Sequence, residues 1–559
     1  MISRAHRNVG SQLTTAEVDV IVVGAGFAGL YALYEVRNLG YSITVLEQAD
    51  NVGGTWYWNS YPGARCDVES MDYSYSFSPE LEQEWQWTER YPAQPEVLHY
   101  LNHVADRFDL RRDIRFKRRV IGARYDEDSE RWIVRTDKGE QYVARYLIAA
   151  TGCLSSRLKP HFNGLETFRG RWYHTAAWPR AGVDFAGMSV GIVGTGSTAI
   201  QAIPQVARQA DHIYVFQRTP NFSVPARNVP LTDDMQRNMK ERYPAHREAA
   251  RRSAFGVPVV PNEQSALEVA PEQVKAELDA RWQHGGGASI LRAFADVLQD
   301  ERANTIVADY VREKIRRTVR DQRTAEMLCP YDHPIGTKRI CVDISYYETY
   351  NRENVTLVDI RNNPIEAVTS DGVRLENGEA FALDAIIFAI GFDAMTGALF
   401  DMNLCGRDGV RLADKWAEGP KTYLGLMTTS FPNLFLITGP GSPSVLSNMV
   451  VSIEQHVDWI SHLLEHMRGQ GVTVVEPTHA AEKGWAEHCA EVASGTLYPR
   501  ARSWYTGHNV PGKPSVFMPY VGGVGNYRDT CEQVAQTGYA GLLFDQNEGS
   551  RVPSPGVVP

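Results

Sequence analysis

The chain has 559 residues, more than one hydrophobic core usually organises, so two or three domains are expected. Its 43% apolar and 22% charged residues are the balance of a folded globular protein, which excludes disorder throughout the chain. The net charge of −10 argues against nucleic acid as a partner, and no apolar run approaches the ~20 residues of a membrane span.

The two ends of the chain and the spacing of its cysteines indicate the cellular location of the protein. Residues 1–19 lack the apolar stretch of a secretory signal and are expected to form a short disordered arm, and residues 546–559 are expected to fray. No cysteines have the C-x-x-C spacing, which disfavours a disulfide framework, a zinc site and a dithiol redox centre. We therefore predict a cytoplasmic protein without a metal. The cysteines are Cys66, Cys153, Cys329, Cys341, Cys405, Cys489 and Cys531.

A strand followed by a glycine turn opens the folded part of the chain. Residues 20–23, Val-Ile-Val-Val, run into the turn Gly-Ala-Gly-Phe-Ala-Gly, and the next predicted strand, residues 43–46, ends at an acid. Such a turn lets the backbone approach a pyrophosphate at a helix N-terminus, while the acid accepts a ribose hydroxyl. The pattern predicts a site for FAD or NAD. Its residues are Gly24, Gly26, Phe27, Gly29 and Glu47.

A second glycine-rich loop favours FAD over NAD at this first site. Residues 51–57, Asn-Val-Gly-Gly-Thr-Trp-Tyr, are suited to wrapping a flavin, with Gly54, Thr55 and Trp56 as contacts. Packing in the core is an equal alternative for each aromatic ring of this run.

The strand and glycine turn recur in the middle of the chain. Residues 190–193 lead into a second turn, and the following strand, residues 213–216, ends at Gln217 and Arg218. An arginine in place of the acid removes repulsion toward a 2′-phosphate and can donate two hydrogen bonds to it. We therefore predict NADPH as the second cofactor; the alternative is a solvated surface arginine. The turn residues assigned to NADP are Gly194, Thr195, Gly196, Ser197 and Thr198.

Two such motifs predict an α/β fold with two Rossmann-like dinucleotide-binding domains, one for FAD and one for NADP. Residues 223–334 are rich in Arg, Glu, Gln and Ala and predict a helical insertion in the second domain. Strand patterns resume at residues 355–358 and 385–390. The predicted boundaries are 1–152 and 390–559 for the FAD domain with its C-terminal loop and tail, and 153–222 and 335–389 for the NADP domain.

The join between the domains carries a long motif. Residues 168–179, Phe-Arg-Gly-Arg-Trp-Tyr-His-Thr-Ala-Ala-Trp-Pro, resemble the F-x-G-x-x-x-H-x-x-x-W-P fingerprint of Baeyer–Villiger monooxygenases. Residues 61–67, 336–339, 391–397 and 439–446 are also similar to segments of that family. The resemblance covers nearly the whole chain and is closest to the phenylacetone and steroid monooxygenase branch.

The resemblance implies an FAD enzyme that uses NADPH and O₂ to convert cyclic, aryl-alkyl or steroid ketones to esters or lactones through a C4a-peroxyflavin. The alternatives are a flavin monooxygenase that oxidises nitrogen or sulfur and a flavin-bound NADPH sensor without turnover. We expect a monomer or a small homo-oligomer. For the fingerprint residues a hinge role is favoured over direct chemistry; these are Phe168, Gly170, His174 and Trp178.

The resemblance also implies roles for single residues. Arg339 matches an active-site arginine over the flavin that stabilises the anionic oxygen species, and Asp67 matches its acidic partner; on the sequence alone a structural ion pair is the simpler reading. Lys338 matches a residue beside the NADPH 2′-phosphate, and Trp504 a mobile-loop tryptophan that contacts NADP. The residues that match FAD contacts of the family are Tyr73, Val120, Met449 and Asp67, and those that match NADP contacts are Arg65, Gln201, Thr219 and Arg339. Ser444, Val445 and Leu446 resemble a bulge that lines the substrate pocket, and the alternative for these three residues is simple packing.

Overall fold

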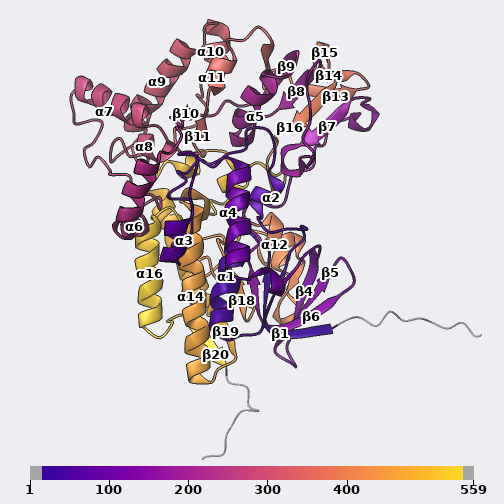
Figure 1. Ribbon diagram of the computed structural model, residues 1–559, viewed down its shortest axis with the longest axis vertical. Coiled ribbons are helices and arrows are strands. Elements are labelled where there is room, and N and C mark those ends of the chain that lie inside the picture. The colour runs from indigo at the N-terminus through magenta and orange to yellow at the C-terminus, as the bar shows by residue number, and fades with distance from the viewer. Residues whose placement is uncertain (1–14, 546–559) are drawn as a thin grey trace, which may run out of the picture.

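Two α/β modules lie one above the other in the computed structural model, which describes residues 15–545 (Figure 1). The first module, lower in the view, is built on an eight-stranded sheet, and the second on a five-stranded sheet. The last third of the chain returns to the first module, where helix α14 (Met449–Gln470) runs beside α1 (Phe27–Asn38).

The sheet of the first module has the strand order β17-β4-β5-β6-β1-β2-β3, with β18 also paired to β6. Strand β1 runs parallel to β2 and β6, while β5 is antiparallel to both of its neighbours, β4 and β6. The bounds are β1 Thr15–Val23, β2 Ile43–Leu46, β3 Ile114–Arg115, β4 Val120–Asp126, β5 Arg131–Thr136, β6 Gln141–Ala149, β17 Leu404–Cys405 and β18 Leu434–Leu436.

The start of β1 corrects the expected disordered arm. Residues 15–19 belong to the strand, because β6 offers them a parallel neighbour from Gln141 onward. The remainder of the expected arm, residues 1–14, and the tail expected to fray, residues 546–559, lie outside the described residues.

The sheet of the second module is entirely parallel, in the order β12-β9-β8-β16-β7. Helix α5 (Ser197–Ala207) follows the second glycine turn, as α1 follows the first. The strand bounds are β7 Arg171–His174, β8 Ser189–Val193, β9 His212–Gln217, β12 Val355–Asp359 and β16 Ala385–Phe388. Smaller sheets contain β10 Ser223–Pro225, β11 Cys341–Asp343, β13 Ile365–Thr369, β14 Gly372–Leu375, β15 Ala380–Ala382, β19 Val474–Pro477 and β20 Leu542–Asp545.

Helices dominate residues 223–334, which begin with the short strand β10. They are α6 Asp233–Arg252, α7 Pro271–His284, α8 Gly287–Leu291, α9 Glu301–Thr318 and α10 Gln322–Leu328. The other helices are α2 Thr55–Trp58, α3 Pro79–Glu84, α4 Gln94–Arg107, α11 Tyr346–Thr349, α12 Gly397–Asp401, α13 Leu412–Lys415, α15 His479–Ser494 and α16 Val524–Gln536.

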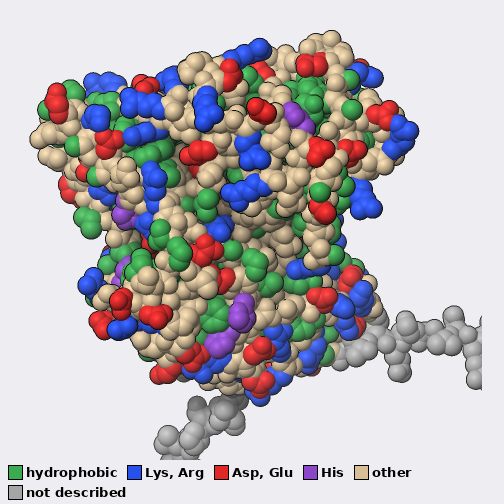
Figure 2. All heavy atoms as spheres, turned by 45° about the horizontal axis from the view of Figure 1, so that its top comes forward, with side chains coloured by type: hydrophobic (Ala, Val, Ile, Leu, Met, Phe, Trp, Pro, Cys, Tyr) green, Lys and Arg blue, Asp and Glu red, His purple; other side chains and the backbone are tan. Residues whose placement is uncertain are grey.

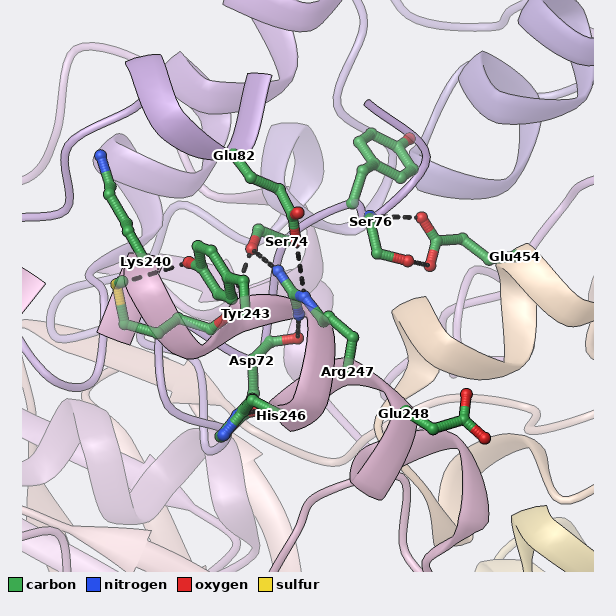
Figure 3. A network of polar contacts seen from close by, with 12 residues as sticks. Asp72, Ser74, Ser76, Glu82, Lys240, Tyr243, His246, Arg247, Glu248 and Glu454 are labelled. Atoms are coloured by element: carbon green, nitrogen blue, oxygen red, sulfur yellow. Dashed lines mark hydrogen bonds and ion pairs between the residues drawn. The ribbon is translucent and has the colours of Figure 1, made fainter. Parts of the chain in front are cut away.

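Helix α6 ties this helical region to the first module through buried polar contacts (Figure 3). Arg247, 4% exposed, donates from Nε to Glu82 at 2.8 Å and from Nη2 to the Ser74 hydroxyl at 2.7 Å. About two helical turns earlier on α6, Lys240 donates from Nζ to the backbone oxygens of Gln83 and Trp85 at 2.7 and 2.6 Å. Since each buried charge has a partner, the contact fixes where α6 lies.

No helix within residues 15–545 is both long and apolar enough to cross a bilayer. The same residues contain no group of His, Cys, Asp or Glu arranged to hold a metal ion, and all seven cysteines are free thiols. On the face in Figure 2 basic and acidic side chains are interspersed.

Replacing Arg247 tests this anchor. Arg247→Met should lower the unfolding free energy by ~3–5 kcal/mol, because it leaves the carboxylate of Glu82 buried without a counter-charge. Thermal unfolding of the FAD-loaded protein measures the loss. The control is Arg252→Met, which removes an exposed ion pair with Glu248 from the same helix and should change Tm little. Equal losses in the two variants would contradict the anchoring role.

Candidate active site

The two glycine turns open into one cavity of about 1540 Å³, here called the main cavity, which both modules line. The first turn contributes residues 24–28 and the second residues 194–198. Two sites predicted from separate parts of the sequence therefore share one space.

The first glycine turn has the shape that a bound pyrophosphate requires. Gly24 has φ +106°, and a Cβ there would lie 2.6 Å from the oxygen of Ala150. A Cβ on Gly26 would lie 3.3 Å from Cα of Gly54, so the two glycine-rich loops meet. Gly29 lies outside the cavity lining; a Cβ there would overlap the oxygen of Gly24, which makes it a packing residue between helix and turn.

Glu47 stands at the carboxyl end of β2 with its side chain 3% exposed. Its Oε2 accepts the N–H of Ala25 and its Oε1 that of Ala49, both at 2.7 Å. Burial raises the pKa of this carboxyl, and the backbone donors counter part of that rise. Each oxygen keeps a lone pair for a hydroxyl, so the residue fits a ribose as predicted for FAD.

Aromatic side chains of the first module line the cavity and also pack on one another. Trp56 donates from Nε1 to the Tyr73 hydroxyl at 3.2 Å, and Tyr73 packs edge-on against Phe27 at 5.1 Å. These rings therefore line the cavity and also take part in core packing. Other predicted FAD contacts that line the cavity are Thr55, Val120 and Met449.

The second glycine turn fits the diphosphate of a dinucleotide. Gly194 has φ +110°, and a Cβ there would lie 2.6 Å from the oxygen of Ala389, whereas Gly196 has open space beside its Cα. Thr195 donates from Oγ1 to the oxygen of Thr219 at 2.8 Å, which links the turn to the segment after β9. Ser197 and Thr198 line the cavity as well.

Among the cations that line the cavity, the predicted Arg218 and Lys338 form a cluster with Arg361. Lys338 forms an ion pair with Asp332 at 3.4 Å. Burial lowers the pKa of the Lys338 ammonium, with Arg218 and Arg361 adding to the decrease while Asp332 opposes it. Clustered cations of this kind suit a dianionic phosphate. The sequence prediction lacked Arg361 and Asp332, which no motif marks.

Arg339 and Asp67 form a bidentate ion pair in the main cavity. Nε lies 2.6 Å from Oδ2 and Nη2 lies 2.8 Å from Oδ1, while Nη1 donates to the oxygen of Val445 at 2.6 Å. Burial raises the pKa of the Asp67 carboxyl, but the charge and hydrogen bonds of Arg339 outweigh it and hold that pKa below its usual value. Burial lowers the pKa of the Arg339 guanidinium, but the charge and hydrogen bonds of Asp67 outweigh this effect, so the pKa lies above its usual value.

Gln201 on α5 bridges the two modules at the edge of the cavity. Its Oε1 accepts the hydroxyl of Tyr61 at 2.8 Å, and its Nε2 donates to the oxygen of Arg65 at 3.0 Å. The Arg65 side chain itself pairs with Glu89 at 2.9 Å. Both predicted NADP contacts line the cavity, and Gln201 also positions one module on the other.

The fingerprint residues lie outside the lining of the main cavity. His174 ends β7 with 5% exposure; its Nδ1 accepts the N–H of Ala176 at 3.0 Å, and its pKa is lowered by burial. Trp178 packs against Phe185, Phe168 lies against the β-sheet core, and a Cβ on Gly170 would lie 2.4 Å from the oxygen of Asp384. This placement fits the hinge role rather than direct chemistry.

The predicted pocket bulge is only partly in the lining of the main cavity. Val445 lines it, but Ser444 is fully buried with φ +41°, and Leu446 faces a different cavity. The cause is the tight 3₁₀ turn of residues 444–446, which sends consecutive side chains in different directions.

The loop that carries Trp504 is fastened to the linker between the modules. Trp504 lines the cavity and lies against Tyr505, with ring centroids 4.3 Å apart. Lys513, 8% exposed at its side chain, bonds to Asp393 at 2.5 Å and to the oxygen of Ala394 at 2.7 Å. Sequence reasoning missed this contact because nothing local marks a lysine for a partner 120 residues away.

Comparison with known proteins agrees with this geometry. Residues 21–273 match the family model described as pyridine nucleotide-disulphide oxidoreductase. A Baeyer–Villiger monooxygenase of Pseudooceanicola batsensis is 43% identical, over 95% of this chain and 97% of its own. The chain belongs to the Baeyer–Villiger monooxygenase family. The structure of an oxidised steroid monooxygenase bound to NADP is 50% identical with a TM-score of 0.91, covering 95% of this chain and 100% of its own.

This membership confirms the resemblance, the fold class and the enzyme class. The protein is an FAD- and NADPH-dependent monooxygenase that oxidises ketones to esters or lactones. A phenazine N-monooxygenase of Lysobacter antibioticus is 39% identical over 96% of this chain and 98% of its own. The relatives at this level of identity therefore include a protein whose name describes the oxidation of nitrogen.

Lys513→Met tests the role of the loop contact. Without the ammonium, Asp393 loses its partner and the loop is held less firmly over the cavity, so the Kd for NADP⁺ should rise about tenfold. Calorimetry on the FAD-loaded protein measures this affinity, and limited proteolysis of residues 504–513 reports the loosened loop. The control is Lys421→Met, at an exposed lysine. Unchanged affinity with Lys513→Met would exclude the fastening role.

Proposed function

We propose that Arg339, oriented by Asp67, is the catalytic cation that acts on the ketone oxygen in the main cavity. The observation that carries the proposal is their bidentate pair in the same cavity as both glycine turns. An arginine has five N–H donors, and three of them bond to Asp67 and Val445 within the described structure. Two remain to donate toward an oxygen that becomes negative during the reaction.

The chain's own residues hold the reaction in place. FAD and NADPH, when bound, supply hydride transfer and oxygen activation, which side chains cannot. Because Asp67 holds the pKa of Arg339 above its usual value, the guanidinium stabilises negative charge without releasing a proton. Trp504 lines the cavity and the Lys513–Asp393 ion pair holds its loop, and in this proposal the loop restricts the entry of water.

We propose the cofactor contacts as predicted from the sequence, with the FAD residues around Gly24 and Glu47 and the NADP residues around Gly194 and Arg218. The proposed FAD domain comprises residues 1–152 and 390–559, and the NADP domain residues 153–222 and 335–389 with the insertion 223–334. We further propose O₂ as co-substrate, no nucleic-acid partner, a cytoplasmic location, and a monomer or small homo-oligomer.

The ketone class is tested by a panel of cyclic, aryl-alkyl and steroid ketones with NADPH, read by product mass. Oxidation of nitrogen is the second candidate, favoured by the phenazine N-monooxygenase relative. A product that has gained one oxygen and contains an ester or lactone supports the oxidation of ketones. Gain of oxygen on an amine or sulfide alone, with no ketone converted, supports the second, and the absence of any product supports a sensor.

Arg339→Ala should lower ester formation at least ~100-fold, because the removed donors face the developing charge. NADPH should still bleach the flavin absorbance, since hydride transfer does not need this guanidinium. Stopped-flow absorbance and product mass measure the two steps separately. Arg502→Ala, which removes an exposed cation that also lines the main cavity, is the control. Ester formation at the normal rate in Arg339→Ala would remove the proposed role.

Arg218→Ala should raise the KM for NADPH by ~10–100-fold and leave the KM for NADH nearly unchanged, because only NADPH loses a charge-assisted contact. Steady-state rates with both nucleotides provide the comparison. Arg208→Ala, at an exposed arginine after α5 in the same module, controls for net charge. An equal effect on both nucleotides would place Arg218 away from the 2′-phosphate.

A further inference from the structure

A second, smaller cavity of about 210 Å³ lies on the other side of the bulge at residues 444–446. Three parts of the chain form its walls: the end of α6 and the helical region that follows, the bulge itself, and the C-terminal segment. Its lining residues include Phe255, Arg292, Leu298, Leu446 and Tyr498. The predicted cofactor contacts do not line it.

The charge that lines this second cavity is positive. Among the residues that the structure describes, Arg292 is the only charged one that lines this cavity, and no carboxylate lines it. Arg292 is half-buried, and its side chain has no hydrogen bond or ion pair within residues 15–545. By contrast, Arg281 and Arg312 of the same helical region pair with Glu277 and Asp309. A half-buried guanidinium without a counter-charge is costly, so an anion is its natural ligand.

Tyr498 adds a neutral donor to the same walls. It is 3% exposed, and its hydroxyl makes no hydrogen bond to the part of the chain that the structure describes. Burial raises the pKa of this phenol, and the charge of Arg339 opposes part of that rise. Its O–H is protonated at neutral pH and can donate to a carboxylate.

The bulge joins the second cavity to the reaction centre. Val445 lines the main cavity and accepts Nη1 of Arg339 at 2.6 Å on its oxygen, and the next residue, Leu446, lines the second cavity. Consecutive residues of the bulge therefore face the cavity that contains Arg339 and the cavity that contains Arg292. Leu446 is half-buried on a turn, a position where a leucine can change rotamer.

The far wall is fixed. The oxygen of Phe255 accepts the N–H of Asn448 at 2.8 Å, which ties the segment after α6 to the residue before α14. The Arg247 contacts shown in Figure 3 hold α6 itself against the first module. A cavity with rigid walls and a single unpaired cation is suited to selecting one group of a ligand.

We propose that the second cavity is a subsite for the acidic end of the substrate, and that Arg292 selects ketones carrying a carboxylate at the far end of an alkyl chain. The inference rests on the proposed function, since it assumes that the ketone oxygen lies at Arg339. It narrows the substrate class to long-chain keto acids and assigns a binding residue that no motif indicates.

A matched pair of substrates tests the subsite. The FAD-loaded enzyme is assayed with 5-oxohexanoate, 7-oxooctanoate and 9-oxodecanoate, and with the methyl ester of each, which keeps the ketone and removes the charge. At one chain length at least, kcat/KM should be about tenfold higher for the acid, the gain expected of one charge-assisted contact. No preference for the acid at any length would overturn the proposal.

Variants assign the preference to its residue. Arg292→Gln should abolish the preference for the acid and leave turnover of the methyl esters unchanged, whereas Arg292→Lys should keep part of it. Arg323→Gln, which removes an exposed cation from α10 in the same helical region, should behave as the wild type. A preference that survives Arg292→Gln, or that falls equally in Arg323→Gln, would overturn the assignment.

Binding without turnover separates this inference from the proposed function. Octanoate has the acidic end but no ketone, and calorimetry should show that its Kd rises about tenfold in Arg292→Gln. If octanoate binds through Arg292 but no ketone or ester substrate is oxidised, the proposed function fails while the anion site stands. If all the ketones are oxidised but octanoate binds both proteins equally, the subsite fails and the function stands.

Discussion

The ion pair between Asp67 and Arg339 is the contact on which the site depends. Asp67 and Arg339 are 272 residues apart in the sequence, and their side chains are in direct contact in the lining of the main cavity. The pair is possible only because each charge compensates the burial of the other. It therefore fixes the position of a guanidinium in the cavity that both glycine turns line, and it leaves two N–H groups of that guanidinium without a partner among the described residues.

Directional polar contacts set the geometry between the modules. Gln201 bridges Tyr61 and Arg65, Lys513 fastens the Trp504 loop to the linker, and Arg247 anchors α6. An apolar interface tolerates sliding, whereas hydrogen bonds and ion pairs weaken steeply when their geometry changes. Such contacts suit an enzyme in which hydride donor, flavin and substrate must be held within narrow limits of distance and angle.

The sequence predicted what depends on local rules. Strand, glycine turn, helix and the residue at the end of the next strand follow one another closely, so the positions of Glu47 and Arg218 beside the glycine turns could be predicted from spacing alone. Contacts made by distant segments carry no such signal: the Lys513–Asp393 ion pair, the third cation Arg361 and the extension of β1 to residue 15 come from tertiary neighbours. The fingerprint indicated the family correctly although its side chains lie outside the cavity lining.

The arginines of the two cavities differ in how their charges are compensated. In the main cavity the cation is paired, so its charge is stable and is offered to an oxygen only through N–H groups that remain. In the second cavity the cation has no partner in the described structure, so its full charge is available for binding. A paired guanidinium suits catalysis because it keeps its position through the reaction, and an unpaired one suits recognition because the ligand completes it.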